Sequence, residues 1–418
     1  MHPILPQWTL SSDVRQRLDS SGTFSLWRIL SKCSLPDRSR HLRTCGVRNL
    51  LCTMGKLKTL HCFRPSRVSL MLLTLVCLFY LLNYFSDVKT DSKLHAWVVD
   101  PSHRKLMHQH TQSILTRQCR PQFVRNAIKT RLNSSWRVTD HFLWRDTVLT
   151  EDMFQYPPPF GLRDMRGKLT DILNLLPTPA AQVHLEKACQ RCVVVGNGGI
   201  LRGMELGPLI DQFDVIIRLN SGPMQGFCRD VGNRTSIRMS YPEGSPKKWE
   251  DPDPRLLFVA VVFKSVDFSW LKAMITKKQV SFWDWLFFWQ KVPDRIPLEL
   301  SQFRILNPDV VRETALDLLH LPTPQSHIWG WDKNVPTLGV TALNLASYLC
   351  DEVSLAGFGY DLTQKGMPLH YYDSLPMTTM LMQTMHDVAQ ETALLKGLVQ
   401  EGVISDLTGA VHCSFCSS

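Results

Sequence analysis

The amino-acid sequence predicts an α/β protein, a single Rossmann-like domain with a twisted and mainly parallel sheet, preceded by one transmembrane helix. Two observations support this prediction. From about Gln182 to Gln400, short apolar runs alternate with stretches of helical period, a pattern typical of a parallel sheet. Ahead of that region, 18 consecutive residues from Val68 to Phe85 carry no charge. As a helix this run would span about 27 Å, close to the hydrocarbon core of a bilayer.

The charges that flank the run predict its orientation. Two lysines lie just after it, and four basic residues lie just before it: Lys56, Lys58, Arg64 and Arg67. By the positive-inside rule, residues 1–67 form a cytosolic tail and the C-terminal bulk faces the lumen of the secretory pathway. A cleaved signal peptide would have a shorter leader and a small-residue cleavage site. Met54 is a second candidate start of translation.

The remaining boundaries follow from this topology. Residues 86–118 are polar and without a clear period, and we expect them to form a stem below a catalytic domain at 119–418. Asn133 and Asn233 begin glycosylation sequons that a luminal domain would expose to modification.

The basic residues are concentrated in the tail. Residues 1–67 hold twelve Lys or Arg and three Asp or Glu, while the remaining residues hold 35 and 34. The overall charge of +10 is therefore a property of the tail, and the bulk of the chain is nearly neutral. This distribution argues against a nucleic-acid partner.

Six apolar runs are predicted strands, and four further stretches are predicted helices. The strands are Val193–Val195, Asp214–Leu219, Ser236–Ser240, Leu256–Phe263, Arg304–Leu306 and Val353–Ala356. The helices are Met204–Gln212, Val310–Leu319, Thr341–Leu349 and Met385–Gln400. Ligands bind at strand ends in such sheets, so the residues that follow the strands are candidates for the site.

The first predicted strand ends in Gly196-Asn-Gly-Gly199, a turn that can bring backbone N–H groups close to a phosphate. A dinucleotide-binding dehydrogenase would have its third glycine at the position of Leu201, and an acidic residue at the position of Asn220. Asn197 and Asn220 instead offer donors and acceptors to a neutral nucleoside. A tight turn with Asn in left-handed geometry and no ligand is the alternative.

Four motifs occur in an order that identifies a family. The stretch from Cys192 to Asn220 resembles the large sialylmotif of the eukaryotic sialyltransferases, glycosyltransferase family 29. Pro336–Asp361 resembles the small sialylmotif, His370–Asp373 the third motif, and His386 with Glu391 the very small motif. The resemblance covers most of the predicted luminal domain. It implies a GT-A-like variant of the Rossmann-like fold, a Golgi membrane enzyme, and CMP-sialic acid as the donor.

The same resemblance implies which residues surround the donor. They are Asn197, Asn220, Thr337, Gly339, Gly357 and Gly359. Glycines there let the backbone approach the ligand, and a plain turn after a strand is a compatible explanation for Gly357 and Gly359. Gly198 departs from the pattern, because some members of the family carry a serine at this position.

Two histidines are candidate catalytic residues. His370 resembles the family's phosphate-contacting histidine and would stabilise the charge on the departing CMP, although by itself it fits a packed core residue equally. His386 is the candidate general base for the acceptor hydroxyl, because imidazole titrates near neutral pH.

The residues around His386 resemble a helix cap. Thr384-Met-His-Asp387 would place His386 in the first helical turn, where the helix dipole disfavours the imidazolium. Glu391 would then lie about 140° around the helix from His386. We therefore expect Glu391 to hold a backbone or a neighbouring loop.

No metal or other cofactor is expected. Asp251-Pro-Asp253 has the spacing that many nucleotide-sugar transferases use for a divalent ion, but it precedes a strand and is crowded by prolines. We interpret it as a loop, and the resemblance implies a metal-independent enzyme.

Seven of the twelve cysteines follow the apolar run and would face an oxidising lumen. The resemblance implies a disulfide between Cys192 and Cys350, and Cys119 with Cys189 is a second candidate pair. Cys413 and Cys416 share a C-x2-C spacing with Cys189 and Cys192, and this spacing also occurs in zinc sites. Since seven is odd, one thiol is left unpaired or joins two chains.

Three stretches resemble the family members that sialylate lactosylceramide, a galactose-terminated glycolipid: Tyr241–Pro246, Phe258–Trp270 and Asn334–Thr337. The expected reaction is inverting transfer of sialic acid to the 3-hydroxyl of that galactose. Members that act on glycoprotein N-acetyllactosamine share many of these residues, so that acceptor and an inactive donor-binding paralogue are the alternatives. Whether the chain forms a homodimer stays open.

The segment Phe282–Trp289 contains six aromatic residues in eight. Two interpretations remain open. The segment is either a buried helix or lid, or it faces the membrane and contacts lipid, because Trp favours the bilayer interface.

Overall fold

The computed structural model describes residues 71, 74–75, 77–78, 97–132, 138, 140–177, 188–324, 333–359, 366–414 and 416. The predicted tail, most of the predicted span Val68–Phe85 and the sequon at Asn133 lie outside these residues. The five described residues of the span are helical. Within the described part of the chain, no helix combines the length and the apolar character needed to cross a bilayer.

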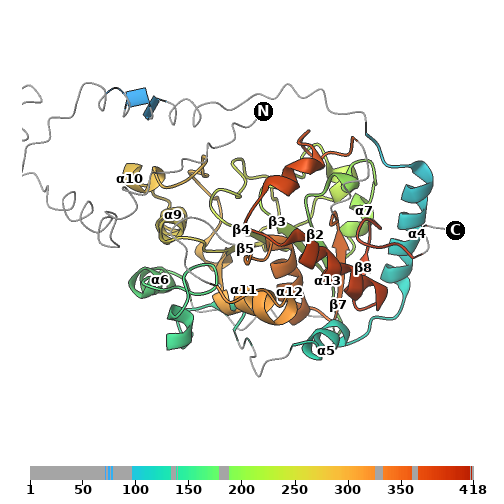
Figure 1. Cartoon of the computed structure of the whole chain (residues 1–418), viewed down its shortest axis with the longest axis horizontal. Coiled ribbons are helices and arrows are strands. Elements are labelled where there is room, and N and C mark those ends of the chain that lie inside the picture. The colour runs from blue at the N-terminus through green and yellow to red at the C-terminus, as the bar shows by residue number, and fades with distance from the viewer. Residues whose placement is uncertain are drawn as a thin grey trace, which may run out of the picture. The chain divides into compact units, whose positions relative to one another are not determined.

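A mixed sheet forms the centre of the domain (Figure 1). Among the described residues its eight strands run in the order β1-β6-β5-β4-β3-β2-β7-β8. Their bounds are β1 Phe142–Leu143, β2 Arg191–Val195, β3 Val215–Leu219, β4 Ile237–Ser240, β5 Leu257–Ala260, β6 Phe303–Leu306, β7 Glu352–Ala356 and β8 Ser405–Asp406. Every neighbouring pair is parallel except β1 with β6. The predicted α/β class and the mainly parallel sheet are confirmed, and β1 and β8 are two-residue strands that sequence analysis missed.

The chain reverses direction across the sheet at β2. It proceeds from β2 through β3, β4 and β5 to β6 on one side, and returns to place β7 on the other side of β2. In a parallel sheet such a reversal opens a crevice at the carboxyl ends of the two neighbouring strands. Gly196 follows β2 and Gly357 follows β7, so both glycine turns lie at this crevice.

Helices cover both faces of the sheet because successive side chains of a strand point to opposite sides. Val194 packs in a cluster with α5 (Phe123–Lys129), α11 (Pro308–Glu313), α12 (Leu338–Leu349) and α13 (Val388–Gln400). Val193 and Val195 pack on the opposite face with α4 (Pro101–Thr116) and α7 (Gly207–Ile210). A further short helix, α8, spans Cys228–Val231.

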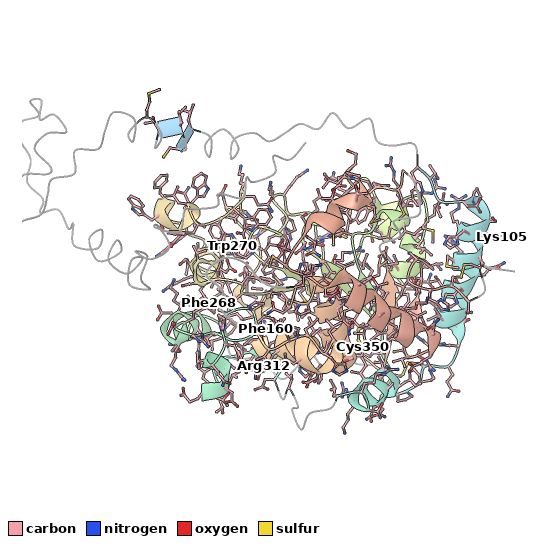
Figure 2. The ribbon with its side chains drawn as sticks, in the orientation of Figure 1. Lys105, Phe160, Phe268, Trp270, Arg312 and Cys350 are labelled. Atoms are coloured by element: carbon pink, nitrogen blue, oxygen red, sulfur yellow. A yellow bond between two sulfur atoms is a disulfide. The ribbon has the colours of Figure 1, made fainter. Side chains whose placement is uncertain are left out.

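The β5 and β6 end of the sheet has its own core. There α6 (Arg166–Leu173) and α9 (Ser265–Ile275) pack against Phe258 and Phe303. Phe268 and Trp270, labelled on α9 in Figure 2, are fully buried, and the indole N–H of Trp270 donates to the carbonyl oxygen of Pro293 at 2.9 Å. This bond fixes the segment after α10 (Phe282–Trp285) against α9.

The structure revises the predicted stem at 86–118. Residues 101–116 form α4, whose first-turn amides donate to the N-cap carboxylate of Asp100. Met107, Thr111 and Ile114 are buried, and His108 Nε2 lies 2.7 Å from the carbonyl oxygen of Met204. The folded domain therefore begins before residue 101, and not at 119.

Two predicted helices also differ from the observed ones. The predicted helix Met204–Gln212 is helical only over α7. The last helix begins at Val388 with Asp387 as its N-cap, because the Asp387 side chain accepts from the amide of Gln390. His386 therefore precedes the helix, and the predicted position in its first turn is wrong.

Three disulfides are present among the described residues. They join Cys119 to Cys189, Cys192 to Cys350, and Cys413 to Cys416. The first two are the pairs proposed from sequence, and Cys192–Cys350 ties β2 to the residue just after α12. Because Cys413 and Cys416 are bonded to each other, their C-x2-C spacing belongs to a disulfide and not to a zinc site. Cys228 is the unpaired cysteine that the odd number required.

Candidate active site

The glycine turn after β2 is held against two other motifs. The amide of Gly198 donates to the carbonyl oxygen of Gly357 at 3.0 Å, and the amide of Tyr371 donates to that of Asn197 at 3.0 Å. Gly198 and His370 also form an isolated antiparallel bridge. The large, small and third motifs therefore meet at the crevice between β2 and β7.

Close contact explains the glycine at position 198. A Cβ atom there would lie 2.6 Å from the carbonyl oxygen of Gly357. Gly357 itself has a φ of 72°, a conformation that favours glycine. In this chain, the backbones of the two turns approach too closely for a serine at 198 without a shift of Gly357.

Asn197 and Asn220 lie at the ends of neighbouring parallel strands, and both are half-buried. Asn197 Nδ2 donates to the carbonyl oxygen of Leu219 at 3.4 Å. Asn220 has a φ of 51°, and its side-chain oxygen accepts from Ser240 Oγ at 3.2 Å. Left-handed geometry thus occurs at Asn220, whereas Asn197, in the glycine turn for which it was considered, does not adopt it.

The buried ion pair between Arg238 and Asp251 holds the backbone of Asn220. Arg238 donates to Asp251 at 2.9 Å and to the carbonyl oxygen of Asn220 at 2.6 Å, and Thr235 Oγ1 donates to Asp251 at 2.6 Å. Asp251 belongs to the predicted loop Asp251–Asp253, and its carboxylate is engaged inside the protein. In the described part of the chain, no group of three or more His, Cys, Asp or Glu side chains is arranged to hold a metal.

The small and very small motifs are joined by a carboxylate. Glu391 accepts from the Thr337 amide and from Thr337 Oγ1, both at 2.6 Å. Thr337 is the N-cap of α12, and its hydroxyl oxygen accepts from the amide of Val340 at 3.4 Å. Glu391 therefore holds the entry of α12, as expected of a residue that binds a neighbouring backbone. Burial raises the pKa of Glu391 to about 7, against the opposing effect of its hydrogen bonds with Thr337.

His386 is oriented by the same pair of segments. Its Nδ1 lies 2.8 Å from the carbonyl oxygen of Val335, so Nδ1 carries the hydrogen and Nε2 keeps its lone pair. The amide of His386 also donates to the side chain of Gln383 at 2.8 Å. Burial lowers the pKa of His386, and the hydrogen bond with Val335 opposes that change. The ring is thus favoured in its neutral form with one nitrogen free, which is the state that a general base needs.

His370 has a carboxylate partner that sequence analysis did not single out. Its Nδ1 lies 2.6 Å from Asp373 Oδ2, and its ring stacks on Tyr372 with centroids 5.1 Å apart. About a quarter of the His370 side chain is exposed, so it is not the packed core residue considered from sequence. The i+3 spacing in His370–Asp373 was the signal that could have revealed this pair.

Phe358 connects the two halves of the candidate site. A Cβ on Gly196 would meet the Phe358 ring at 3.2 Å, and one on Gly339 would meet it at 2.8 Å. Gly339 belongs to the first turn of α12, beside Thr337. Gly359 has a φ of 97° and abuts the carbonyl oxygen of Ala410. The six proposed donor residues therefore form one contiguous rim, with Glu391 and His386 at one end and His370 at the other.

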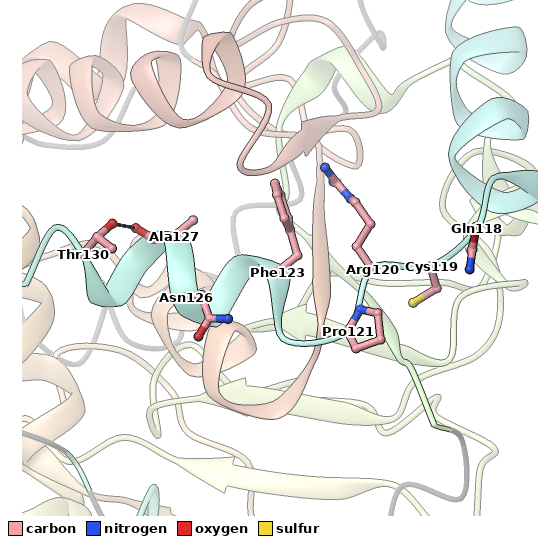
Figure 3. Close-up of a pocket in the computed structure, with 8 residues that line it drawn as sticks. All are labelled: Gln118, Cys119, Arg120, Pro121, Phe123, Asn126, Ala127 and Thr130. Carbon is pink, nitrogen blue, oxygen red and sulfur yellow. Dashed lines mark hydrogen bonds between the residues drawn. The ribbon is translucent and has the colours of Figure 1, made fainter.

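A surface depression on α5 lies apart from this rim (Figure 3). It is lined in part by Arg120, whose guanidinium stacks on the ring of Phe123 at 3.4 Å. Of the residues proposed from sequence only Cys119 lines it, and that cysteine is bonded to Cys189. The depression holds none of the candidate catalytic groups.

Comparison with known proteins supports this assignment of the motifs. The model of glycosyltransferase family 29 (sialyltransferase) matches residues 142–403. Lactosylceramide alpha-2,3-sialyltransferase of Homo sapiens is 48% identical over 80% of this chain and 80% of its own length, and that of Rattus norvegicus is 47% identical over 79% and 86%.

More distant similarities agree with these. The CMP-N-acetylneuraminate-beta-1,4-galactoside alpha-2,3-sialyltransferase of Mus musculus is 40% identical over 62% of this chain and 68% of its own. A crystal structure of a mammalian sialyltransferase in complex with Gal-beta-1-3GalNAc-ortho-nitrophenol shares the fold, with a TM-score of 0.52. It is 22% identical and covers 69% of this chain and 98% of its own.

Proposed function

The chain belongs to glycosyltransferase family 29, the sialyltransferases, and we propose that it transfers sialic acid from CMP-sialic acid to the galactose 3-hydroxyl of lactosylceramide. The product is a sialylated glycosphingolipid, a ganglioside, formed with inversion at the anomeric carbon. The acceptor rests on relatives of that name, which are 46–48% identical, against 40% for relatives named for a beta-1,4-galactoside acceptor.

The donor would lie along the rim formed by Asn197, Asn220, Thr337, Gly339, Gly357 and Gly359. The two asparagine amides would recognise the neutral nucleoside, because each offers a donor and an acceptor. A Cβ on Gly357 would meet the side chain of Leu201, and one on Gly339 would meet that of Phe358, so glycine at these positions lets the turns that form the rim pack together. No metal or further cofactor is proposed, because CMP carries one phosphate and His370 can oppose its charge.

The observation that carries the mechanism is the contact of His386 Nδ1 with the carbonyl of Val335 at 2.8 Å. It leaves Nε2 free to accept the proton of the acceptor hydroxyl as the oxygen attacks the anomeric carbon. The bond from that carbon to the CMP phosphate breaks in the same step. When both nitrogens of His370 carry hydrogens, Nδ1–H donates to Asp373 and Nε2–H is left for the departing phosphate.

We also propose the location given by the sequence: a type II protein of the Golgi membrane, with a luminal catalytic domain. The three disulfides fit an oxidising compartment. Asn233 is exposed and available to a glycan in that compartment.

The full chain, incubated with CMP-sialic acid and either lactosylceramide or an asialo-glycoprotein, tests the proposal. We expect sialic acid on the 3-position of galactose in the glycolipid, at a kcat/KM well above that for the glycoprotein. The reverse preference would favour the glycoprotein acceptor. Binding of CMP without transfer to either acceptor would identify an inactive paralogue.

A further inference from the structure

The α10 segment presents a large apolar surface to solvent. Five side chains from this segment are between 52% and 72% exposed: Phe282, Trp283, Leu286, Phe287 and Trp289, here called the α10 patch. The interpretation of the segment as a buried helix is therefore wrong. A cluster of five exposed large apolar residues on one short segment is unusual for a soluble surface and marks a contact site.

The α10 patch is held in place by the rest of the domain. Ser281 caps the turn by accepting from the amide of Asp284 at 3.1 Å. Phe288 is buried between the exposed residues, with Lys264 Nζ 5.0 Å from its ring centroid. The side-chain amide of Gln290 donates to the carbonyl oxygen of Glu243 at 2.6 Å. Figure 1 shows α10 beside α9 at the border of the domain.

Basic side chains border the patch. Lys278, Lys291 and Arg295 are exposed on the two flanking segments, and so is the acid Asp294, whereas the ammonium group of Lys277 donates to the backbone carbonyl of Leu298. Asp284, within the patch, accepts from Ser281 Oγ at 2.8 Å. Tryptophan and phenylalanine bordered by lysine match a bilayer interface, where the rings enter the headgroup region and the cations meet lipid phosphates.

The patch is connected to the donor rim through one loop. Glu243, which receives the bond from Gln290, also pairs with Lys264 at 2.8 Å. The next residue, Gly244, abuts Asn220: a Cβ there would lie 2.6 Å from Asn220 Oδ1. The aromatic surface and the nucleotide-binding edge are therefore two sides of the same β4–α9–α10 region.

We propose that the α10 patch inserts into the headgroup region of the bilayer that carries the glycolipid acceptor, and so holds the donor rim at the membrane surface. The acceptor in this statement rests on the proposed function, whereas the bilayer contact is tested independently. A partner protein or a second copy of the chain would not require the basic border next to the exposed rings.

The test uses the full chain reconstituted into phosphatidylcholine vesicles with one-fifth phosphatidylserine and a trace of diazirine-bearing phosphatidylcholine. After irradiation, lipid adducts are mapped by mass spectrometry. We expect adducts within residues 282–289, and a decrease of about tenfold in the double variant Trp283→Ser/Phe287→Ser. Val148→Ser, which removes an isolated exposed apolar side chain, is the matched control and should leave the adducts unchanged.

Absence of adducts in residues 282–289 of the wild type would overturn the proposal. Cross-links between two copies of the chain at the lysines beside these residues, obtained with a bifunctional amine-reactive reagent in place of the lipid probe, would also overturn it, in favour of a second copy. A second measurement compares kcat/KM for lactosylceramide in the same vesicles and for free lactose. The double variant should lose about tenfold on the vesicle acceptor and keep its rate on lactose. Equal loss on both would contradict the proposal.

The two measurements separate the two proposals. If the wild type sialylates neither acceptor, the proposed function fails, and the photolabelling still decides whether the α10 patch contacts lipid.

Discussion

Replacement of Glu391 by glutamine should change how stability depends on pH. The Glu391 carboxyl is buried and bridges the amide and hydroxyl of Thr337, both at 2.6 Å. Burial raises its pKa to about 7 from the ordinary value of 4.5. Between these values the folded chain binds a proton at Glu391 that the unfolded chain has released.

The sign and size of the effect follow from proton linkage. Because the folded state binds more protons between pH 4.5 and about 7, stability falls as pH rises through this window and levels off above it. The difference of about 2.5 pKa units corresponds to roughly 3 kcal/mol. Glutamine has no proton to release, and its carbonyl oxygen still accepts from the Thr337 amide while its NH2 group donates to Oγ1.

Urea unfolding of the full chain, followed by tryptophan fluorescence at pH 5 and pH 8, measures the effect. Since pH 5 already lies inside the window, the stability lost by the wild type between the two pH values should exceed that lost by Glu391→Gln by roughly 2.5 kcal/mol. Burial also raises the pKa of Asp267 to about 6. This group contributes equally to both chains, so its effect cancels in the comparison. Glu151→Gln, at a largely exposed side chain, should behave as the wild type. Parallel pH curves for the wild type and Glu391→Gln would refute the linkage.

Three further predictions test the site. His386→Gln should lower kcat by ~10²–10⁴-fold with little change in the Kd for CMP, and the acid limb of the wild-type rate profile should lie below pH 6.5 because burial lowers the pKa of His386. Arg238→Met should cost about 3–5 kcal/mol in thermal unfolding, since it leaves the buried Asp251 unpaired, whereas the exposed Arg229→Met should cost little. Dialysis against a chelator should leave the transfer rate unchanged; loss that added Mn²⁺ or Mg²⁺ restores would contradict the metal-independent proposal.

The parts of the fold predicted best are those whose signal is local. Every predicted strand is present, because buried parallel strands are short continuous apolar runs. The two missed strands, β1 and β8, have two residues each and no such run. The two glycine turns meet because β7 pairs with β2. The sequence does not reveal this strand order, so it could not predict that the turns lie together.

The stem was mispredicted because α4 is apolar on too narrow a face. Only Met107, Thr111 and Ile114 are buried in α4, and Leu106 and Leu115 pack half-buried against the same core cluster. His103 and His108 reach the carbonyl oxygens of Thr408 and Met204. Residues that are far apart in the chain create these contacts, so composition alone made the segment resemble a polar linker.

The start of α13 was misplaced because two capping patterns overlap. Thr384 and Asp387 are both good N-cap residues, and the three-residue spacing from Asp387 to Gln390 fits the observed cap better. The predicted neutral state of His386 is nevertheless supported by the structure, for a different reason. Burial is the main cause that disfavours the imidazolium, and the hydrogen bond with Val335 opposes it.

This change of cause alters which residues control the base. A dipole would depend on α13 alone, whereas burial and the Val335 carbonyl depend on how the segment before α12 packs against the segment before α13. Glu391 joins these two segments through Thr337, and Cys350 anchors the far end of α12 to β2. The orientation of His386 is therefore a property of the α12–α13 pair, held at one end by a carboxylate and at the other by a disulfide.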